Sequence, residues 1–288
     1  LPIMVWGKEM DQLFQSTSLG PLTLKNRIVR SATNEHLSEP DGQVTHAWAD
    51  ALIELAAHEV GLVISGHFCV DASQRADEGQ PVLDEKTDRE ILRCAADGVH
   101  QYGSKVLIQL SHSGIKAMER VNGAAAKHPE DFSLSELDRL VERFVYAAEC
   151  CKVCGFDGVQ IHTAHGYLLS NFLNPSENRR TDAYGGSLEN RFRLIARILS
   201  AVRAACGDDF AALAKADCNG CGDFPALLKL YESCGVDAVE VSGVDFNHRA
   251  GQKTPFYAQA LLQGSNCVSL PVFPVGGVFS RQTAEELL

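Results

Sequence analysis

The sequence predicts an α/β fold arranged as a (β/α)8 barrel, and three observations support this prediction. Short apolar runs rich in Val, Ile and Ala recur along the chain, at residues 27–32, 61–66, 104–110, 156–162, 211–217, 236–243 and 271–277. Amphipathic helical stretches lie between these runs, and such alternation is typical of a parallel sheet. Polar side chains follow several different runs, as expected of a barrel whose site is assembled from many strand ends.

The length allows one large domain or two ordinary ones, and because α/β barrels of this size are often single domains, we expect one domain spanning residues 1–288. The chain has 288 residues, is 45% apolar and carries a net charge of −11. A negative chain argues against a nucleic-acid partner, which needs a positive surface. Its apolar runs are shorter than the roughly 20 residues that cross a bilayer. The N-terminal residues lack the features of a secretion signal, so we expect a cytoplasmic protein that is not bound to a membrane.

The first elements of the chain read as a hairpin. In "FQSTSLGPLTLKNR" (residues 14–27), two short apolar segments flank Gly20 and Pro21. Both residues favour a tight turn. We expect this hairpin to close the bottom of the barrel.

The helices between the strands carry start and stop signals. Ser133 and Glu136 have the spacing of a capping box, and the apolar face that follows ends at Gly155. The same design recurs over residues 187–207 and 223–235. These segments predict helices of ordinary length on the outside of the sheet.

An open doubly wound sheet is the alternative closure. That fold normally has a glycine-rich turn after its first strand, whereas residues 33–43 read "TNEHLSEPDGQ". After the seventh strand the chain continues as "FSRQTAEELL" (279–288), without an eighth strand. We therefore expect a barrel truncated before strand 8, with its C-terminal strand and helix missing or supplied by another segment or chain.

The ten cysteines indicate a reducing compartment, where they remain free thiols. "CCKVC" (150–154) falls on a predicted helix, where the thiols pack as small apolar groups. "CNGC" (218–221) follows a strand, and a redox or metal role stays open there.

The most informative segment is "IHTAHGY", at the end of the fourth strand. His162 and His165 allow three interpretations: a metal site, two ordinary core histidines, or a site for an anionic oxygen. A metal would need further ligands, and the helical H-E-x-x-H pattern is absent. Two imidazole donors suit an oxygen on which charge develops. Tyr167, on the same turn, is able to deliver a proton. Such a set suits hydride addition to an activated C=C bond, provided that a cofactor supplies the hydride.

The longer segment "HTAHGYLLSNFLNPSENRRTDAYGGSLENR" resembles the signature of the old yellow enzyme family, the FMN-dependent NAD(P)H:flavin oxidoreductases and ene-reductases. "LKNRIVRSAT", "VLIQLSHSG", "GVDAVEVSG" and "PVFPVGGVFS" agree with it, so the resemblance covers roughly residues 11–288. It implies a barrel with FMN in its mouth, NADH or NADPH as the reductant, and no metal.

The resemblance also implies roles for individual residues. His162 and His165 match the pair that holds the substrate carbonyl, and Tyr167 matches the proton donor. Gln109 and Lys215 match contacts to the flavin pyrimidine edge. The remaining implied cofactor contacts are Ser31, Ala32, Thr33, Asn34, Gly66, Gly276 and Gly277, the last two at the phosphate. The polar run 179–191 matches a structural loop held by charge pairs.

Plainer interpretations of these residues stay open. Gln109 is readable as an ordinary polar strand end, Tyr167 as a packing residue, and Lys215 as the partner of a carboxylate such as Asp217 or Glu240.

The function implied is transfer of hydride from NAD(P)H, through FMN, to the C=C bond of a small α,β-unsaturated carbonyl compound. One alternative is the flavin barrel of a larger iron–sulfur flavoenzyme that acts on an enoyl thioester, a steroid or an amine. The other is a catalytically degenerate barrel that binds a ligand or partner. A homo-oligomer is an expectation by analogy alone. The sequence does not decide between NADH and NADPH, or name the substrate.

Overall fold

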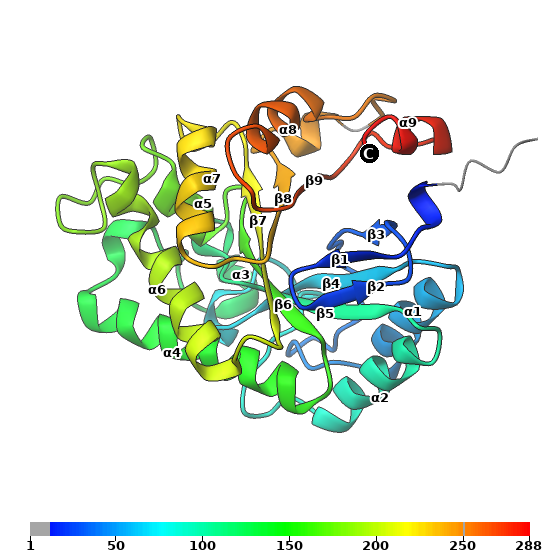
Figure 1. The fold of residues 1–288 in the computed structure, drawn as a ribbon. Helices are drawn as coiled ribbons and strands as arrows, with labels where there is room; N and C mark the ends of the chain where they lie inside the picture. Colours follow the sequence, from blue (N-terminus) through cyan, green and yellow to red (C-terminus); the bar gives the residue numbers. More distant parts are fainter. Residues whose placement is uncertain (1–11, 250) are drawn as a thin grey trace, which may run out of the picture.

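The computed structural model describes residues 12–249 and 251–288, and its centre is a curled sheet of parallel strands (Figure 1). The sheet order follows the chain, β3-β4-β5-β6-β7-β8-β9, and every neighbouring pair is parallel. The strands are β3 (Val29–Arg30), β4 (Leu62–Cys69), β5 (Lys105–Ser111), β6 (Gly158–Thr163), β7 (Ala211–Asp217), β8 (Ala238–Ser242) and β9 (Val272–Pro274). These positions confirm the seven predicted strands and the barrel-type α/β fold.

The strands are continuous apolar runs because both faces of the sheet are covered. Every residue of β4, β6, β7 and β8 is buried. Helices cover the outer face, as Figure 1 shows. The inner face surrounds the barrel interior, so a polar residue on these strands lies in a dry environment unless it faces the upper rim.

The long helices are α1 (His46–Ala57), α2 (Arg89–His100), α4 (Leu134–Val153), α6 (Leu188–Cys206), α7 (Phe224–Ser233) and α8 (Ala258–Ser265). The shorter ones are α3 (Glu119–Asn122), α5 (Leu168–Leu173) and α9 (Arg281–Glu285). The predicted capping box is present at the start of α4, where Ser133 accepts from the Glu136 N–H and the Glu136 carboxylate accepts from the Ser133 N–H. The side chains of Ser187 and Asp223 cap α6 and α7, and each accepts a hydrogen bond from one backbone N–H.

The predicted hairpin lies at the bottom of the barrel. Strands β1 (Thr17–Leu19) and β2 (Leu22–Leu24) pair antiparallel around Gly20 and Pro21. Leu19, Leu22 and Leu24 pack against inward-facing residues of the central strands: Leu62, Ile64, Leu107, Ala211, Leu213 and Ala238. The hairpin therefore closes the bottom with an apolar plug, as the sequence predicts.

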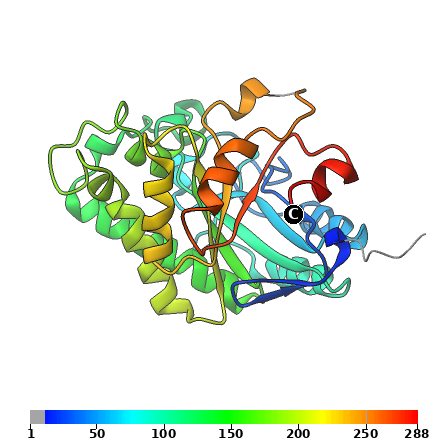
Figure 2. The ribbon, with the colours of Figure 1, turned by 45° about the horizontal axis from the view of Figure 1, so that its top comes forward.

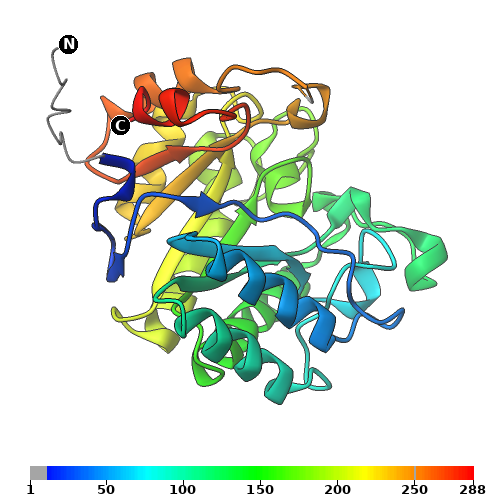
Figure 3. The same ribbon diagram turned by 90° about the vertical axis from the view of Figure 1, so that its right-hand side faces the viewer.

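One side of the sheet is open within the described residues. β3 and β9 form the two edges and pair with no common neighbour in this part of the chain. In Figure 2 the blue N-terminal segment and the orange and red C-terminal segment flank this side, and Figure 3 looks onto it. A cavity of about 1020 Å³ lies between the two edges, and its lining runs from Leu24 at the hairpin to Ser31, Glu240 and Gly276 near the rim.

The cysteines contribute mostly to packing. Cys150, Cys151 and Cys154 are buried in the large core cluster, as predicted for the "CCKVC" segment. Within residues 12–249 and 251–288, no group of three or more His, Cys, Asp or Glu side chains is arranged to hold a metal ion. In the same described ranges, no helix has the length and apolar character needed to cross a membrane.

Candidate active site

Three side chains of the predicted site converge just after β6. The ring centroids of His162 and His165 are 5.2 Å apart, and those of His162 and Tyr167 are 4.9 Å apart. His162 lies within β6, His165 follows it with a left-handed φ of 62°, and Tyr167 precedes the first residue of α5. The sharp turn at His165 brings the three rings to the same end of one strand.

Neighbouring strands hold His165 in this unusual backbone conformation. Its N–H donates to Asp217 Oδ2 at 2.7 Å, and its Nε2 lies 2.7 Å from Ser242 Oγ. The imidazole also stacks on Phe246, with ring centroids 5.1 Å apart. A non-glycine residue with positive φ costs roughly 1 kcal/mol or more, so these contacts offset a local strain.

Burial fixes the protonation states of the three rings. It lowers the pKa of His162 and of His165 well below the usual range, and the positive charges of Lys215 and Lys116 act in the same direction. Burial raises the pKa of Tyr167 to about 12. At neutral pH the imidazoles are therefore neutral hydrogen-bond donors and the phenol keeps its proton.

A third histidine, His67, belongs to the same group. Its ring centroid lies 4.9 Å from that of Tyr167 and 5.9 Å from that of His162. The apolar run identified in the sequence ends at residue 66, whereas β4 extends to Cys69 and its register shifts between Ile64 and His67. That irregularity is set by tertiary packing, and only the polarity of His67 in an apolar run signals its importance.

Gln109 presents an oxygen to the barrel interior. Its Nε2 donates to Gln160 Oε1 at 2.6 Å, and Gln160 Nε2 donates to the Glu240 carboxylate at 2.8 Å. A carboxylate only accepts, so this chain fixes both amides and leaves Gln109 Oε1 as a free acceptor among the described groups.

Lys215 lies almost fully buried at the centre of the site. Its Nζ donates to Ser31 Oγ at 2.9 Å and lies 3.6 Å from Glu240 Oε1. The ion pair with a carboxylate that the sequence leaves open is therefore present, with Glu240 as the partner. Lys215 is the only basic residue of β7, and its ammonium group lies next to Ser31.

The residues predicted after the first strand form an irregular segment. The Gly66 N–H donates to both carboxylate oxygens of Glu35 at 3.1 Å, and a Cβ at Gly66 would collide with Thr33, Asn34 and Glu35. The Asn34 amide donates to Asp77 at 3.2 Å. Because Gly66 has no side chain, residues 33–35 can pack directly against its backbone. Of the predicted group, Ser31 lines the cavity, and Ala32 packs against the apolar cluster at the barrel bottom.

Gly276 and Gly277 form the turn after β9. Their φ angles are 89° and 76°, a region that favours glycine, and both line the cavity. A Cβ at Gly276 would meet the Phe256 ring, and one at Gly277 would meet the Thr254 carbonyl oxygen at 1.9 Å. The turn is therefore possible only with glycines.

The polar run 179–191 is mainly structural, as predicted. Arg180 pairs with Asp182 and donates to the carbonyl oxygens of Pro129 and Phe132. Arg191 is buried and donates to carbonyl oxygens of Leu173, Gly186 and Cys221. These contacts hold the loop between α5 and α6 behind the histidine pair.

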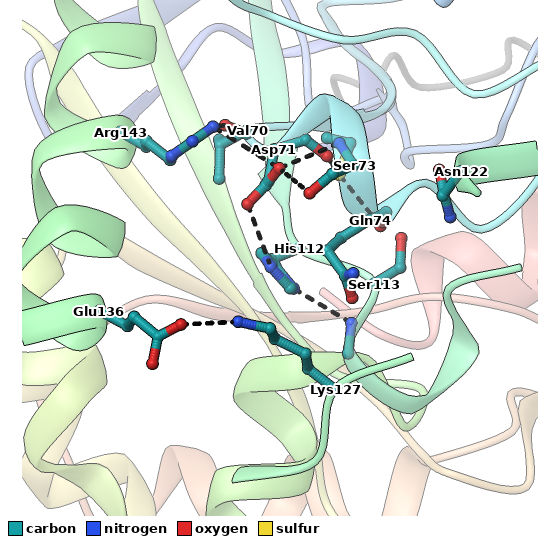
Figure 4. Close-up of polar contacts among 12 residues, drawn as sticks. Val70, Asp71, Ser73, Gln74, His112, Ser113, Asn122, Lys127, Glu136 and Arg143 are labelled. Atoms are coloured by element: carbon teal, nitrogen blue, oxygen red, sulfur yellow. Dashed lines mark hydrogen bonds and ion pairs between the residues drawn. The ribbon is translucent and has the colours of Figure 1, made fainter. Parts of the chain in front are cut away.

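A second polar cluster anchors the loops beside the site (Figure 4). His112 accepts from the Gly114 N–H through Nδ1, and its Nε2 lies 4.0 Å from Asp71 Oδ2. Asp71 also caps a short turn through the Ser73 N–H and lies 3.6 Å from Arg143. Burial lowers the pKa of His112 to about 4, so this ring is neutral. The cluster ties the loops that follow β4 and β5 to helix α4.

The residues present fit a flavin mononucleotide. Gln109 on β5 offers a fixed acceptor for an imide N–H, and Lys215 on β7, the next strand but one, offers a cation beside Ser31. His162 Nδ1 is buried and has no hydrogen-bond partner among the described residues, so an oxygen of a bound molecule would satisfy it.

Comparison with known proteins agrees with this chemistry. The family model described as "NADH:flavin oxidoreductase / NADH oxidase family" matches residues 12–215. An NADPH dehydrogenase of Bacillus licheniformis is 32% identical, over 96% of this chain and 86% of its own length. An NADH oxidase of Thermoanaerobacter brockii is 27% identical over 96% of this chain, which spans only 46% of that relative.

Solved structures share the fold. The old yellow enzyme homologue from Zymomonas mobilis has a TM-score of 0.81 at 23% identity, with 96% of this chain and 84% of that chain covered. A 2-naphthoyl-CoA reductase in complex with 2-naphthoyl-CoA has a TM-score of 0.87 at 21% identity, with 96% and 48% covered. The chain shares its fold with old yellow enzyme homologues, belongs to the NADH:flavin oxidoreductase / NADH oxidase family and is an oxidoreductase that uses FMN and NAD(P)H.

Proposed function

We propose that this protein reduces the activated C=C bond of small α,β-unsaturated carbonyl compounds. The observation that carries the proposal is the convergence of His162, His165 and Tyr167 after β6, in protonation states that suit this reaction. An enone needs a donor at its carbonyl oxygen and a proton at its α-carbon, and this turn offers both.

The two histidines would bind the carbonyl oxygen of the substrate. As neutral imidazoles they donate hydrogen bonds without adding a buried charge, and the orphaned His162 Nδ1 gains a partner. Their interaction strengthens as negative charge develops on that oxygen, which is the property that accelerates a reaction. Removing one such donor commonly lowers the rate by about 10²–10³.

Tyr167 Oη would give its proton to the α-carbon of the substrate. The phenol is half-buried beside His162 and keeps its proton up to a pKa of about 12. When bound, FMN would supply the redox chemistry that links NAD(P)H to the β-carbon of the substrate. Gln109 and Lys215 would hold its pyrimidine edge, and Gly276 and Gly277 would form its phosphate turn.

An anaerobic two-stage experiment tests the proposal. The flavin-loaded protein is reduced with NADPH or NADH, and 2-cyclohexenone is then added. We expect bleaching of the flavin absorbance in the first stage, and return of the band together with cyclohexanone in the second. A protein that binds no FMN, or that is reduced but never reoxidised by any enone, would refute the function.

A second candidate is the flavin barrel of a larger flavoenzyme. The observation that favours it is coverage, because the chain spans less than half of the Thermoanaerobacter brockii NADH oxidase and of the 2-naphthoyl-CoA reductase. Iron and acid-labile sulfide in the protein purified from its native source would support this candidate, and their absence would favour the first.

We also propose a reducing, cytoplasmic setting. The ten cysteines, several of them buried in the core as free thiols, support it. Fractionation of native cells would test it. Sedimentation of the purified protein would test the homo-oligomer expected by analogy.

A further inference from the structure

A chain of hydrogen bonds fixes the proton on the His67 ring. The Ala76 N–H donates to Gln80 Oε1 at 2.6 Å, and a backbone N–H only donates, so the orientation of the Gln80 amide is settled. Gln80 Nε2 lies 2.7 Å from His67 Nδ1, and an amide nitrogen also only donates. His67 Nδ1 must therefore accept, and the proton of the neutral ring is on Nε2.

The surroundings make this arrangement rigid. Gln80 and Ser111 are fully buried, and Ser111 Oγ lies 3.2 Å from the same Nδ1. The loop that carries Ala76 and Gln80 is anchored at its start by Asp71, which caps the turn shown in Figure 4. Burial lowers the pKa of His67 to about 4, so the ring keeps one proton at neutral pH.

The free N–H of His67 belongs to a ring that lies next to the reacting groups. Nε2 is the second nitrogen of the ring, and among the described residues it has no hydrogen-bond partner, whereas Nδ1 has two. The ring meets Tyr167 edge to face at 4.9 Å and lies 5.9 Å from His162. A fixed donor with an open side, next to the proton donor, is arranged to receive an acceptor from a bound molecule.

We propose that His67 Nε2 donates a hydrogen bond to an oxygen on the α-substituent of the substrate, so that the site selects enones with an acyl group at the α-carbon. The proposal rests on the proposed function, since Tyr167 there delivers its proton to the α-carbon. A group attached to that carbon comes next to the ring that packs against Tyr167.

Two matched substrates test the selection. 2-Acetyl-2-cyclohexenone carries the acceptor, and 2-isopropenyl-2-cyclohexenone has the same shape with CH₂ in place of the oxygen. We expect His67→Phe, which keeps a ring and removes the donor, to lower the acetyl-to-isopropenyl ratio of kcat/KM by about tenfold, the size of one hydrogen bond to a buried group. His67→Gln, which restores an N–H, should recover part of the ratio.

Each outcome of this experiment either supports or overturns the inference or the proposed function. A ratio within twofold of the wild type in His67→Phe would overturn the inference, and so would an equal loss with both substrates, because a structural role does not discriminate between them. If the wild type reduces neither compound nor 2-cyclohexenone, the proposed function fails. If the wild type reduces 2-cyclohexenone but His67→Phe leaves the acetyl-to-isopropenyl ratio unchanged, this inference fails and the proposed function stands.

A second measurement needs no flavin. Histidine ¹⁵N chemical shifts of the labelled protein report the tautomer of each ring, and we expect the Nε2–H tautomer for His67 from pH 6 to 8. Gln80→Glu replaces the donor to Nδ1 by an acceptor of the same size and should shift the proton to Nδ1 or add a second one. A His67 signal with the proton on Nδ1 in the wild type would overturn the inference.

Discussion

The backbone N–H of His165 donates to Asp217 Oδ2 at 2.7 Å, and this bond joins the end of β7 to the left-handed residue of the histidine pair. The same oxygen accepts from Ser170 Oγ at 2.8 Å, on helix α5. Asp217 is 3% exposed, and its other oxygen has no partner among the described residues. One carboxylate therefore sets the turn that carries His165 and the helix that follows Tyr167.

Removing this carboxylate should impair substrate binding more than flavin reduction. Asp217→Ala leaves the His165 N–H and the Ser170 hydroxyl buried without an acceptor, which costs about 1–3 kcal/mol for each group. We expect kcat/KM for 2-cyclohexenone to fall about 10–100-fold, as the donor geometry loosens. Asp217→Asn keeps an acceptor oxygen and should lose less than tenfold. Stopped-flow measurement of both half-reactions checks this, and equal losses in both variants would contradict it.

The same residue should make stability depend on pH. Burial raises the pKa of Asp217 from 3.8 to about 7 in the folded protein. Between these values the folded state binds more protons than the unfolded state, so the free energy of unfolding falls as pH rises from about 4 to about 7. The effect on unfolding amounts to at most about 4 kcal/mol.

Asp217→Asn removes this titration. Its stability relative to the wild type should therefore increase from pH 4 to pH 8, measured by urea denaturation at each pH. The nearby ammonium groups of Lys215 and Lys116 and the neutral histidines are common to both proteins. Parallel stability curves for the two proteins would show that Asp217 is ionised throughout.

Tyr167→Phe should separate proton transfer from hydride transfer. The variant keeps the ring that packs against His162 and His67 and removes the acidic hydrogen. We expect turnover of 2-cyclohexenone to fall about 10²–10⁴-fold, with the rate of flavin reduction by NAD(P)H within twofold of the wild type. Because burial holds the pKa of Tyr167 at about 12, the wild-type rate should show no loss from tyrosine ionisation up to pH 9. A decline between pH 7 and 9 that Tyr167→Phe abolishes would contradict the assignment of this pKa.

The strand ends were predictable because, in a parallel barrel, each buried strand is a short apolar run and polar residues follow it at the rim. His162, His165 and Tyr167 lie in one short segment, so their proximity follows from local sequence alone. Gln109 and Lys215 required only that adjacent strands end at the same rim. The hairpin around Gly20 and Pro21 followed from turn chemistry.

The contacts that orient these residues were not predictable in the same way. The acceptor role of Asp217 depends on the left-handed turn at His165, and Lys215 had two acidic candidates until the sheet register placed Glu240 opposite it. His67 acquires its tautomer from Gln80, which reaches it through a loop held by tertiary contacts. Such relationships depend on the packing of distant segments, which periodicity does not encode.

The buried pair of Lys215 and Glu240 gives a last prediction. The two groups are 2% and 0% exposed, and their closest atoms are 3.6 Å apart. Lys215→Met leaves a buried carboxylate without its cation, and Glu240→Gln leaves a buried ammonium with Ser31 as its remaining hydrogen-bond acceptor. Breaking a buried pair from one side typically costs about 3–5 kcal/mol. We expect each single variant to lose stability in this range, measured by urea denaturation without flavin.

The double variant decides whether the pair itself stabilises the fold. With both charges removed, neither side chain is left as an uncompensated buried ion, so the combined loss should be smaller than the sum of the single losses by about 1–3 kcal/mol. A double variant as stable as the wild type would mean that the ion pair contributes nothing to folding, and that Lys215 is retained for the cation it places beside Ser31. Additive losses would instead show that the two groups act independently, which a separation of 3.6 Å in a dry interior does not allow. Because Lys215 is also a proposed flavin contact, the FMN dissociation constant of Glu240→Gln serves as the control: freeing the ammonium from its carboxylate should leave FMN binding intact or tighter, whereas Lys215→Met should weaken it.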